Sequence, residues 1–201
     1  SGFAIAGRSA DGITWTAVAS PPAATHDFMS IDAAPNGGIF VFLQNINTAT
    51  YFTSTDAITW VTQTGVLPAT ARWNSVAYGN GTFVAIAGYP GGASTVAATS
   101  TNGTSWILRT LPVSDIWRSI IWNGRLFVVV AQGSLNILTS PDGITWTSQA
   151  FPGGANYNWH SIQTNDAGAL IASASNLADA VYCSADDAAT WASKALTASG
   201  T

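Results

Sequence analysis

Short runs that alternate apolar and polar residues fill this chain, and turn-forming dipeptides separate many of them. One apolar run begins at Trp73 and leads through Asn80-Gly81 into a second run over residues 83–86. Similar pairs of runs begin at Phe28, Trp117 and Trp159. Because Asn and Gly tolerate the positive φ of tight turns, each pair predicts a β-hairpin, here called strands A and B. No segment shows the periodicity of an amphipathic helix, so the sequence predicts an all-β protein with almost no helix.

A second pattern, Ser-x-Asp-Gly-x-Thr-Trp, recurs between these hairpins at intervals of about 40–46 residues. Its copies occupy residues 9–15, 54–60, 100–106, 140–146 and 184–191. The Asp or Asn side chain accepts backbone N–H bonds within such a turn, and the Trp is expected to be buried. The residues assigned to this structural role are Asp11, Asp56, Asn102, Asp142, Asp186, Trp15, Trp60, Trp106, Trp146 and Trp191. Strands C and D flank each turn, and four strands per repeat are typical of a β-propeller blade.

The repeats predict that residues 1–201 form a single β-propeller domain with five blades, one of them incomplete. Strands C and D occur five times, whereas strands A and B occur four times. A closed ring has no half blade, because an open strand edge invites pairing with other chains. The missing strands would precede Ser1 in a longer protein, come from another copy in a homo-oligomer, or be absent from a five-bladed ring. We favour the five-bladed ring.

The repeated turn resembles the Asp-box, or BNR, repeat of sialidase-type β-propellers, a repeat found in phage tail and bacterial surface proteins. The family pattern is Ser-x-Asp-x-Gly-x-Thr-Trp. The copy that begins at Ser184 has this length, with Ala188 at the Gly position, and the other copies are one residue shorter. The resemblance implies that the box lies on the face opposite the ligand site. Its Asp residues are therefore expected to form turns and to take no part in catalysis.

Composition excludes several classes of function. The net charge is −4 and charged residues make up 8 % of the chain, which argues against a nucleic-acid partner. No apolar run reaches the roughly 18 residues of a membrane span, so no membrane insertion is expected. One cysteine forms no internal disulfide, and the two histidines lack a metal-binding spacing. We therefore predict no metal and no cofactor.

Catalysis is also not expected. The resemblance to sialidases implies a Tyr nucleophile, a Glu that activates it, an Asp acid/base and three substrate-binding Arg residues. This chain contains no Glu. Arg8 and Arg109 fall on predicted outer strands, and Arg125 falls in a predicted turn. The sequence therefore predicts that the protein is not an enzyme.

Ligand binding is expected at the loops that differ between repeats, because variation over a rigid scaffold is where recognition usually occurs. The D–A loops are residues 20–26, 65–72, 112–116 and 151–158, and the B–C loops are residues 44–47, 89–92, 132–135 and 175–179. They carry amide and hydroxyl groups beside aromatic rings, a combination that suits sugars. The candidate ligand-binding residues are Tyr89, Tyr157, Asn158, His160, Arg118, Arg72, Asn45 and Asn47.

These patterns predict a non-catalytic, lectin-like recognition module that binds a glycan or a host cell-surface receptor. Such a module would belong to a phage tail or a bacterial surface, so an extracellular or virion-associated location is expected. A purely structural propeller of a virion, an engineered repeat scaffold and a glycosidase with unusual residues are the alternatives. The partners left open are another copy in a homo-oligomer and further chain segments that complete the half blade.

Overall fold

The described part of the chain is built from β-strands and turns. The computed structural model describes residues 6–9, 11–18, 28–35, 38–44, 47–151, 157–175 and 181–194. Within these ranges no residue is helical, and the prediction of an all-β protein is confirmed. No helix long and apolar enough to cross a membrane occurs in the described ranges.

The strands follow the repeats. The first two, β1 (Ala6–Arg8) and β2 (Thr16–Val18), form a hairpin around the first repeated turn. The others are β3 (Phe28–Ala33), β4 (Phe40–Gln44), β5 (Asn47–Thr48), β6 (Tyr51–Ser54), β7 (Val61–Gln63), β8 (Ala71–Gly79), β9 (Thr82–Ala87), β10 (Ser94–Ser100), β11 (Ile107–Trp122), β12 (Phe127–Ser134), β13 (Asn136–Ser140), β14 (Thr147–Ala150), β15 (Tyr157–Thr164), β16 (Leu170–Ala174), β17 (Val181–Ser184) and β18 (Ala192–Lys194).

Antiparallel pairing joins these strands into successive meanders. They are β3-β4-β6-β7, β8-β9-β10-β11, β11-β12-β13-β14 and β15-β16-β17-β18. Each meander has the order A, B, C, D that the repeats predict. Strand C ends at the Ser of the repeated turn in each case, as Ser100 does in β10 and Ser140 does in β13.

Strand β11 departs from the sequence prediction, because it serves two meanders. Its first part pairs with β10, with Ile107 opposite Thr99, and its second part pairs with β12, with Trp117 opposite Ala131. The loop predicted at residues 112–116 is therefore wrong, since pairing on both sides keeps the connection extended. The loop predicted at residues 132–135 is also too long, since β12 continues to Ser134.

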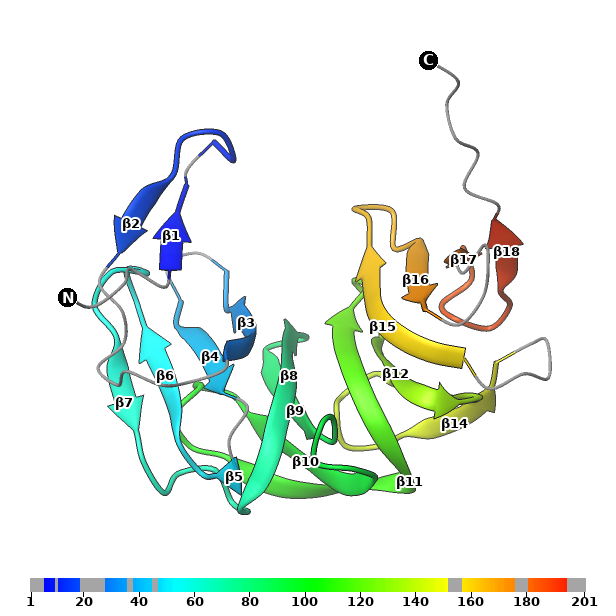
Figure 1. Cartoon of the computed structure of the whole chain (residues 1–201), viewed down its shortest axis with the longest axis horizontal. Helices are drawn as coiled ribbons and strands as arrows, with labels where there is room; N and C mark the ends of the chain where they lie inside the picture. The colour runs from blue at the N-terminus through cyan, green and yellow to red at the C-terminus, as the bar shows by residue number, and fades with distance from the viewer. Residues whose placement is uncertain are drawn as a thin grey trace.

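The meanders lie side by side in an open arc, with β3, β8, β11 and β15 on its concave side (Figure 1). The hairpin β1–β2 lies at one end of the arc, and β15–β18 lie at the other. Pairing among the described strands does not close the arc into a ring. The five-bladed ring remains a prediction.

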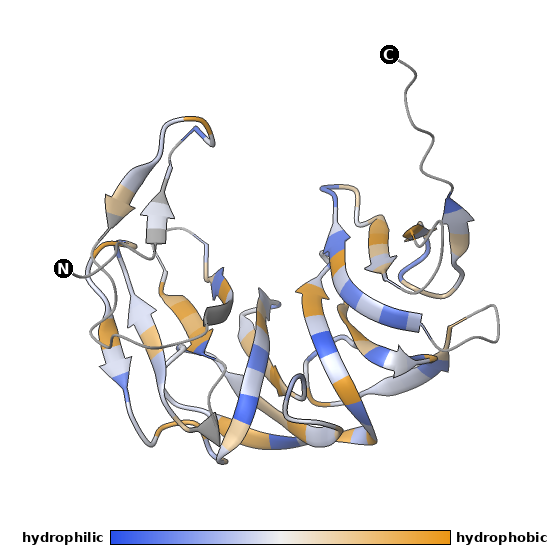
Figure 2. Ribbon diagram, viewed as in Figure 1, coloured by the Kyte–Doolittle hydropathy of each residue, from blue (hydrophilic) through white to orange (hydrophobic). Residues whose placement is uncertain are grey.

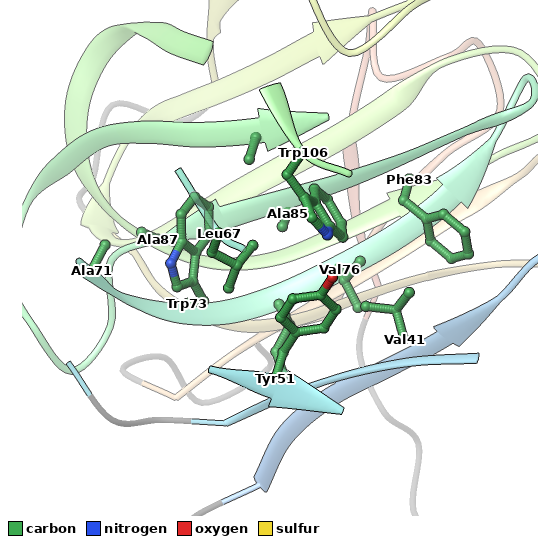
Figure 3. Packing of buried hydrophobic residues seen from close by; sticks show 12 residues of the cluster. Val41, Tyr51, Leu67, Ala71, Trp73, Val76, Phe83, Ala85, Ala87 and Trp106 are labelled. Carbon is green, nitrogen blue, oxygen red and sulfur yellow. The ribbon is translucent and has the colours of Figure 1, made fainter. Parts of the chain in front are cut away.

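The core lies between successive meanders. In one of these contacts Tyr51 of β6 meets Trp106 edge-on, with ring centroids 5.9 Å apart (Figure 3). Trp73, Trp117 and Trp159 on the inner strands are almost completely buried. Apolar and polar residues alternate along several strands in Figure 2, because successive side chains point to opposite faces of a sheet. Apolar burial of large aromatic side chains is therefore what holds neighbouring meanders together.

The repeated turns are closed by side-chain hydrogen bonds. Asp142 Oδ1 accepts the N–H groups of Ile144 at 2.8 Å and Thr145 at 2.7 Å. Ser140 Oγ donates to the same carboxylate and accepts the N–H of Gly143, whose φ of 72° suits glycine. Side chains at the same position in the other turns also accept backbone N–H bonds, namely those of Asp11, Asp56, Asn102 and Asp186.

The Trp residues of the turns are not uniformly buried. Trp106 and Trp191 are each 9 % exposed, whereas Trp60 and Trp146 are half-buried. Trp15 is 66 % exposed, so the expectation that every Trp of the motif is buried is wrong. Trp15 belongs to the hairpin at the end of the arc, where fewer strands surround it.

Candidate functional site

A pocket of about 600 Å³ lies between the inner strands on the concave side of the arc. Its lining comes from β3, β8, β11 and β15, with Tyr89 added from the segment that follows β9. Polar side chains that line it include Asp32, Asn74, Arg118, His160, Gln163 and Thr164. Such a concave surface with convergent polar groups is the usual form of a binding site.

A β-bulge points the key side chains into this pocket. The pairing register shifts between Trp73 and Ser75, and it shifts at the equivalent place in the other inner strands. The residue inside each shift has no partner in the ladder, and bulges of this kind change the direction of a side chain. In three inner strands that residue is Asn74, Arg118 or His160, and all three line the pocket.

A repeated serine holds neighbouring inner strands together. Ser30 Oγ accepts the N–H of Val76 at 3.1 Å, and Ser75 Oγ accepts the N–H of Ile120 at 3.2 Å. Ser119 Oγ accepts the N–H of Ile162 at 3.4 Å. The serine follows the bulged residue directly, so each bond fixes a strand next to the side chain that enters the pocket.

Arg118 is at the centre of a polar cluster. Its Nη2 lies 2.6 Å from Nδ1 of His160, and its guanidinium carbon lies 3.5 Å from the centroid of the Tyr89 ring. Because Arg can only donate, His160 Nδ1 must accept, which leaves the imidazole proton on Nε2. The stacking on Tyr89 adds a cation–π interaction. His160 is exposed, and its side chain lines the pocket.

Tyr89 reaches this cluster because its segment docks closely on β11. The backbone N–H of Tyr89 donates to the carbonyl of Trp117 at 3.2 Å. A Cβ on the preceding Gly88 would lie 2.7 Å from the backbone nitrogen of Trp117, which is closer than side chains tolerate. Glycine at this position therefore lets the Tyr89 ring lie over Arg118.

Two polar atoms of the cluster are buried and have no hydrogen-bond partner within the described ranges. They are Oδ1 of Asn74 and Nη1 of Arg118. Asn74 is 2 % exposed, and its Nδ2 donates to the carbonyl of Arg118 at 3.0 Å. No carboxylate pairs with Arg118 in the part of the chain that the structure describes, where the ion pair is Arg125–Asp187. Buried unpaired groups cost free energy, and both of these groups belong to residues that line the pocket.

Asp32 is a pocket residue that the sequence did not reveal. Its Oδ2 accepts the N–H of Tyr78 at 2.7 Å, and its Oδ1 accepts the N–H of Ala33 at 2.8 Å. Burial raises the pKa of Asp32 above its ordinary value, and the two N–H bonds oppose that shift. The signal available in the sequence was variation, because Ala77, Ile121 and Gln163 occupy its position in the other repeats. The position of Asn74 also varies between the repeats, where Met29, Arg118 and His160 occupy it.

The structure brings three of the predicted ligand-binding residues together in the pocket, and these are Tyr89, Arg118 and His160. Arg72 lines a separate pocket of about 260 Å³, and Ala71 and Val96 are among the other residues that line it. The ring of Tyr157 is 4 % exposed and its hydroxyl lies 3.0 Å from that of Tyr182, so it belongs to the core. Asn158 follows it on β15 and is half-buried. Asn47 is paired with Arg72 through the backbone, and Asn45 lies outside the described residues.

The other arginines do not converge on this pocket. Arg109 Nε donates to Thr99 Oγ1 at 3.0 Å on outer strands, and Arg125 Nη1 lies 3.0 Å from Asp187. Arg118 alone of the arginines with described side chains lines the pocket. In the same ranges no group of three His, Cys or Asp side chains is arranged to hold a metal ion.

Comparison with known proteins places the fold. No protein-family model and no curated protein matches the chain. Among solved structures, YCF48 from Cyanidioschyzon merolae is 16 % identical with a TM-score of 0.63, over 87 % of this chain and 57 % of that one. A catalytically inactive virginiamycin B lyase from Staphylococcus aureus with quinupristin is 14 % identical with a TM-score of 0.67, over 90 % of this chain and 58 % of that one.

A third similar structure is YCF48 bound to a D1 peptide, at 17 % identity and a TM-score of 0.60, over 90 % of this chain and 57 % of that one. YCF48 and virginiamycin B lyase are β-propellers, so the chain has a fold of the β-propeller class. The chain spans less than two thirds of the length of these proteins. At such low identity the likeness concerns the fold alone.

Proposed function

We propose that this chain is a non-catalytic recognition module whose ligand binds in the pocket between β3, β8, β11 and β15. The observation that carries the proposal is the cluster of Asn74, Arg118, His160 and Tyr89, which bulges direct into the pocket and which contains unpaired polar atoms. Repeated serine bonds hold the strands in place, so the site is largely preformed. A preformed site loses less entropy when it binds.

The absence of a second carboxylate supports a binding role over glycoside hydrolysis. Most glycosidases place two carboxylates about 5–9.5 Å apart around the scissile bond. Asp32 is the one acidic residue among the described residues that line the pocket, and both of its oxygens accept backbone N–H groups. The chain also contains no Glu.

The proposed ligand is a glycan or part of a cell-surface receptor, in an extracellular or virion-associated setting, as the low charge and the Asp-box resemblance suggest. A peptide segment is the second candidate. It is favoured by the similar YCF48 structure, which is bound to a D1 peptide. Both candidates use the same pocket, and a binding screen separates them.

The test is to probe the labelled chain on a glycan array and on a peptide array in parallel. Arg118→Met keeps the aliphatic stem and removes the guanidinium, and Arg72→Met is the matched control in the separate pocket. The proposal expects binding that falls about 10-fold or more in Arg118→Met and persists in Arg72→Met. Binding that is unchanged in Arg118→Met, or no binding on either array, would overturn it.

A further inference from the structure

The contact between Arg118 and His160 depends on the protonation state of the imidazole. Arg118 Nη2 lies 2.6 Å from His160 Nδ1, and both residues line the pocket. Because arginine only donates hydrogen bonds, Nδ1 has to accept in this contact. An imidazole that carries a second proton has no acceptor nitrogen left. The bond therefore exists only while His160 is neutral.

Protonation of His160 turns this bond into a repulsion between two cations. An imidazole ordinarily takes up its second proton at about pH 6.5, and Nδ1 then becomes a donor. Nη2 and Nδ1 would face each other as two donors with no acceptor between them. The Tyr89 ring, 3.5 Å from the guanidinium carbon, holds Arg118 in place, whereas the His160 side chain is exposed and free to rotate.

We infer that the Arg118–His160 pair binds a carboxylate group of the ligand when His160 is protonated. The carboxylate accepts from Arg118 Nη2 and from the Nδ1–H of His160, and its negative charge separates the two cations. Hydrogen bonds between ionised groups of this kind are about twice as strong as those between neutral groups. The inference rests on the proposed function and specifies both the chemical group that the pocket selects and the pH at which it binds.

The strands around His160 supply no carboxylate that takes this place. β11 carries Asp115 and Arg109 besides Arg118, but Asp115 Oδ2 accepts from Ser134 and Asn136, and Arg109 Nε donates to Thr99. The strands β12 and β16, which pair with β15, contain no charged residue. β15 itself contains none besides His160. Arg118 is therefore the charged group that His160 faces among these strands.

Asp32 is the other group of the pocket that changes its charge in mild acid. It lies on β3, and β8 lies between β3 and β11. Burial raises the pKa of its carboxyl group, so its protonation also makes the pocket less negative as the pH falls. Tyr78 and Tyr89 complete the set of titratable lining residues, and phenols ordinarily ionise only near about pH 10. The test therefore has to separate His160 from Asp32.

The test measures the affinity of small carboxylates by NMR titration of the isotope-labelled chain at two pH values. N-acetylglycine is compared with N-acetylglycine N-methylamide, and glucuronate is compared with glucose, so that each pair differs in the carboxylate. We expect a carboxylate to bind about 10-fold more tightly at about pH 5.5 than at about pH 8, and its neutral counterpart to show no such difference. Binding of N-acetylglycine identifies a peptide source, and binding of glucuronate identifies an acidic sugar.

The imidazole resonances of His160 provide a second readout in the same samples. Binding and protonation are reciprocally coupled, so a 10-fold preference for the protonated form requires that saturating carboxylate raise the half-protonation pH of His160 by about one unit. The chain has two histidines, and His160→Gln identifies the resonance by its loss. Equal affinity at the two pH values, an unchanged His160 titration, or no binding of either carboxylate would each overturn the inference.

Variants assign the effect to the pair. His160→Gln is expected to remove the pH dependence, and Arg118→Met is expected to remove carboxylate binding, whereas Asp32→Asn is expected to keep most of the 10-fold ratio. Thermal melts show that the variants fold. A ratio that disappears in Asp32→Asn but persists in His160→Gln would assign the effect to Asp32 and overturn the inference. A neutral ligand that depends on Arg118 equally at both pH values would also overturn it, but would leave the proposed function standing.

Discussion

At the scale of single residues, the repeated turn depends on one side-chain oxygen. Asn102 accepts the N–H groups of Thr104 and Ser105 at 2.9 and 2.8 Å, much as Asp142 accepts those of Ile144 and Thr145. The chain therefore contains both an ionised and a neutral version of the same turn. The carbonyl oxygen of Asn is sufficient for the geometry, and the negative charge of Asp strengthens the bonds.

The first prediction compares two substitutions of Asp142. Asp142→Ala removes the acceptor of two backbone N–H bonds and is expected to lower the free energy of unfolding by about 1–2 kcal/mol. Asp142→Asn keeps an acceptor, as Asn102 does, and is expected to lower it by less than half as much. Chemical denaturation of the three proteins measures both values. Equal losses in the two variants would show that the charge, and not the acceptor, forms the turn.

The second prediction concerns how the stability of the fold changes as the pH is lowered. Backbone N–H bonds hold the pKa values of Asp11 and Asp56 below the ordinary value of 3.8. Bonds from Thr190 and Ser184 lower the pKa of Asp186. For Asp142 desolvation acts in the opposite direction, but N–H bonds still lower the pKa. A carboxyl group with a lowered folded pKa adds stability above its unfolded pKa, and this stability is lost as the pH falls through the folded value.

The contribution of Asp32 to stability changes with pH in the opposite direction, because burial raises the pKa of its carboxyl group. Its ionisation costs stability, and the cost disappears as the pH falls through its raised folded pKa. The melting temperature is therefore expected to rise slightly as the pH falls from 7 into the range where Asp32 becomes protonated in the folded chain, and to fall below about pH 4, where the turn carboxylates lose their contribution. Asp32→Asn should remove the rise, and Asp142→Asn should reduce the fall. A wild-type melting temperature that stays constant down to pH 2 would contradict the assignment of the turn carboxylates.

At the scale of strands, the sequence predicted what depends on neighbours along the chain. Hairpins, repeated turns and the ends of strand C follow from local Asn, Gly, Ser and Asp residues, and the structure contains them. The bulges and the serine bonds between inner strands were not predicted, because they depend on which strands become neighbours in space. Arg118 and His160 were among the predicted ligand-binding residues, and both occupy the bulged position of their strands. Tyr157 was misplaced, because the aromatic packing that buries it is tertiary.

The third prediction tests the serine bonds between inner strands. Ser75→Ala leaves the N–H of Ile120 without this acceptor, in a place where Ser75 is 6 % and Ile120 is 3 % exposed. The free energy of unfolding is expected to fall by about 1–3 kcal/mol. Ser161 occupies the same position on β15 but bonds to no following inner strand within the described ranges.

Ser161→Ala is therefore the matched control, and its effect is expected to stay within about 0.5 kcal/mol. Denaturation curves of both variants provide the comparison. If the two substitutions cost the same, the bond from Ser75 does not stabilise the contact between β8 and β11.

At the scale of the whole molecule, the same type of packing contact recurs between successive meanders and builds the arc. Val41, Val84 and Val128 occupy equivalent places on strand B, opposite Thr53, Thr99 and Thr139, and all three are fully buried. A Cβ on Gly143, in the next repeated turn, would lie 2.4 Å from Val84 Cγ2, which shows how closely that meander packs on β9. Stability in such a repeat is a sum of units and of contacts between neighbours.

The equivalent position on β16, which is strand B of the last meander, is not covered in the same way. Ile171 lies opposite Cys183 in the same register, and its side chain is 46 % exposed. The repeats in the sequence predicted the equivalence of these positions. They did not predict whether another unit covers the last one, because that depends on how many units surround the axis and on what lies beside them.

The fourth prediction compares these equivalent positions directly. Val84→Thr places a hydroxyl in the contact between two meanders and is expected to lower the free energy of unfolding by about 1–3 kcal/mol. Ile171→Thr makes a similar change on an exposed face and is expected to cost less than about 0.5 kcal/mol. Denaturation at low protein concentration measures both, and light scattering of the same samples measures mass. A loss in Ile171→Thr as large as that in Val84→Thr, together with the mass of a dimer in the wild type, would show that a second copy covers this face.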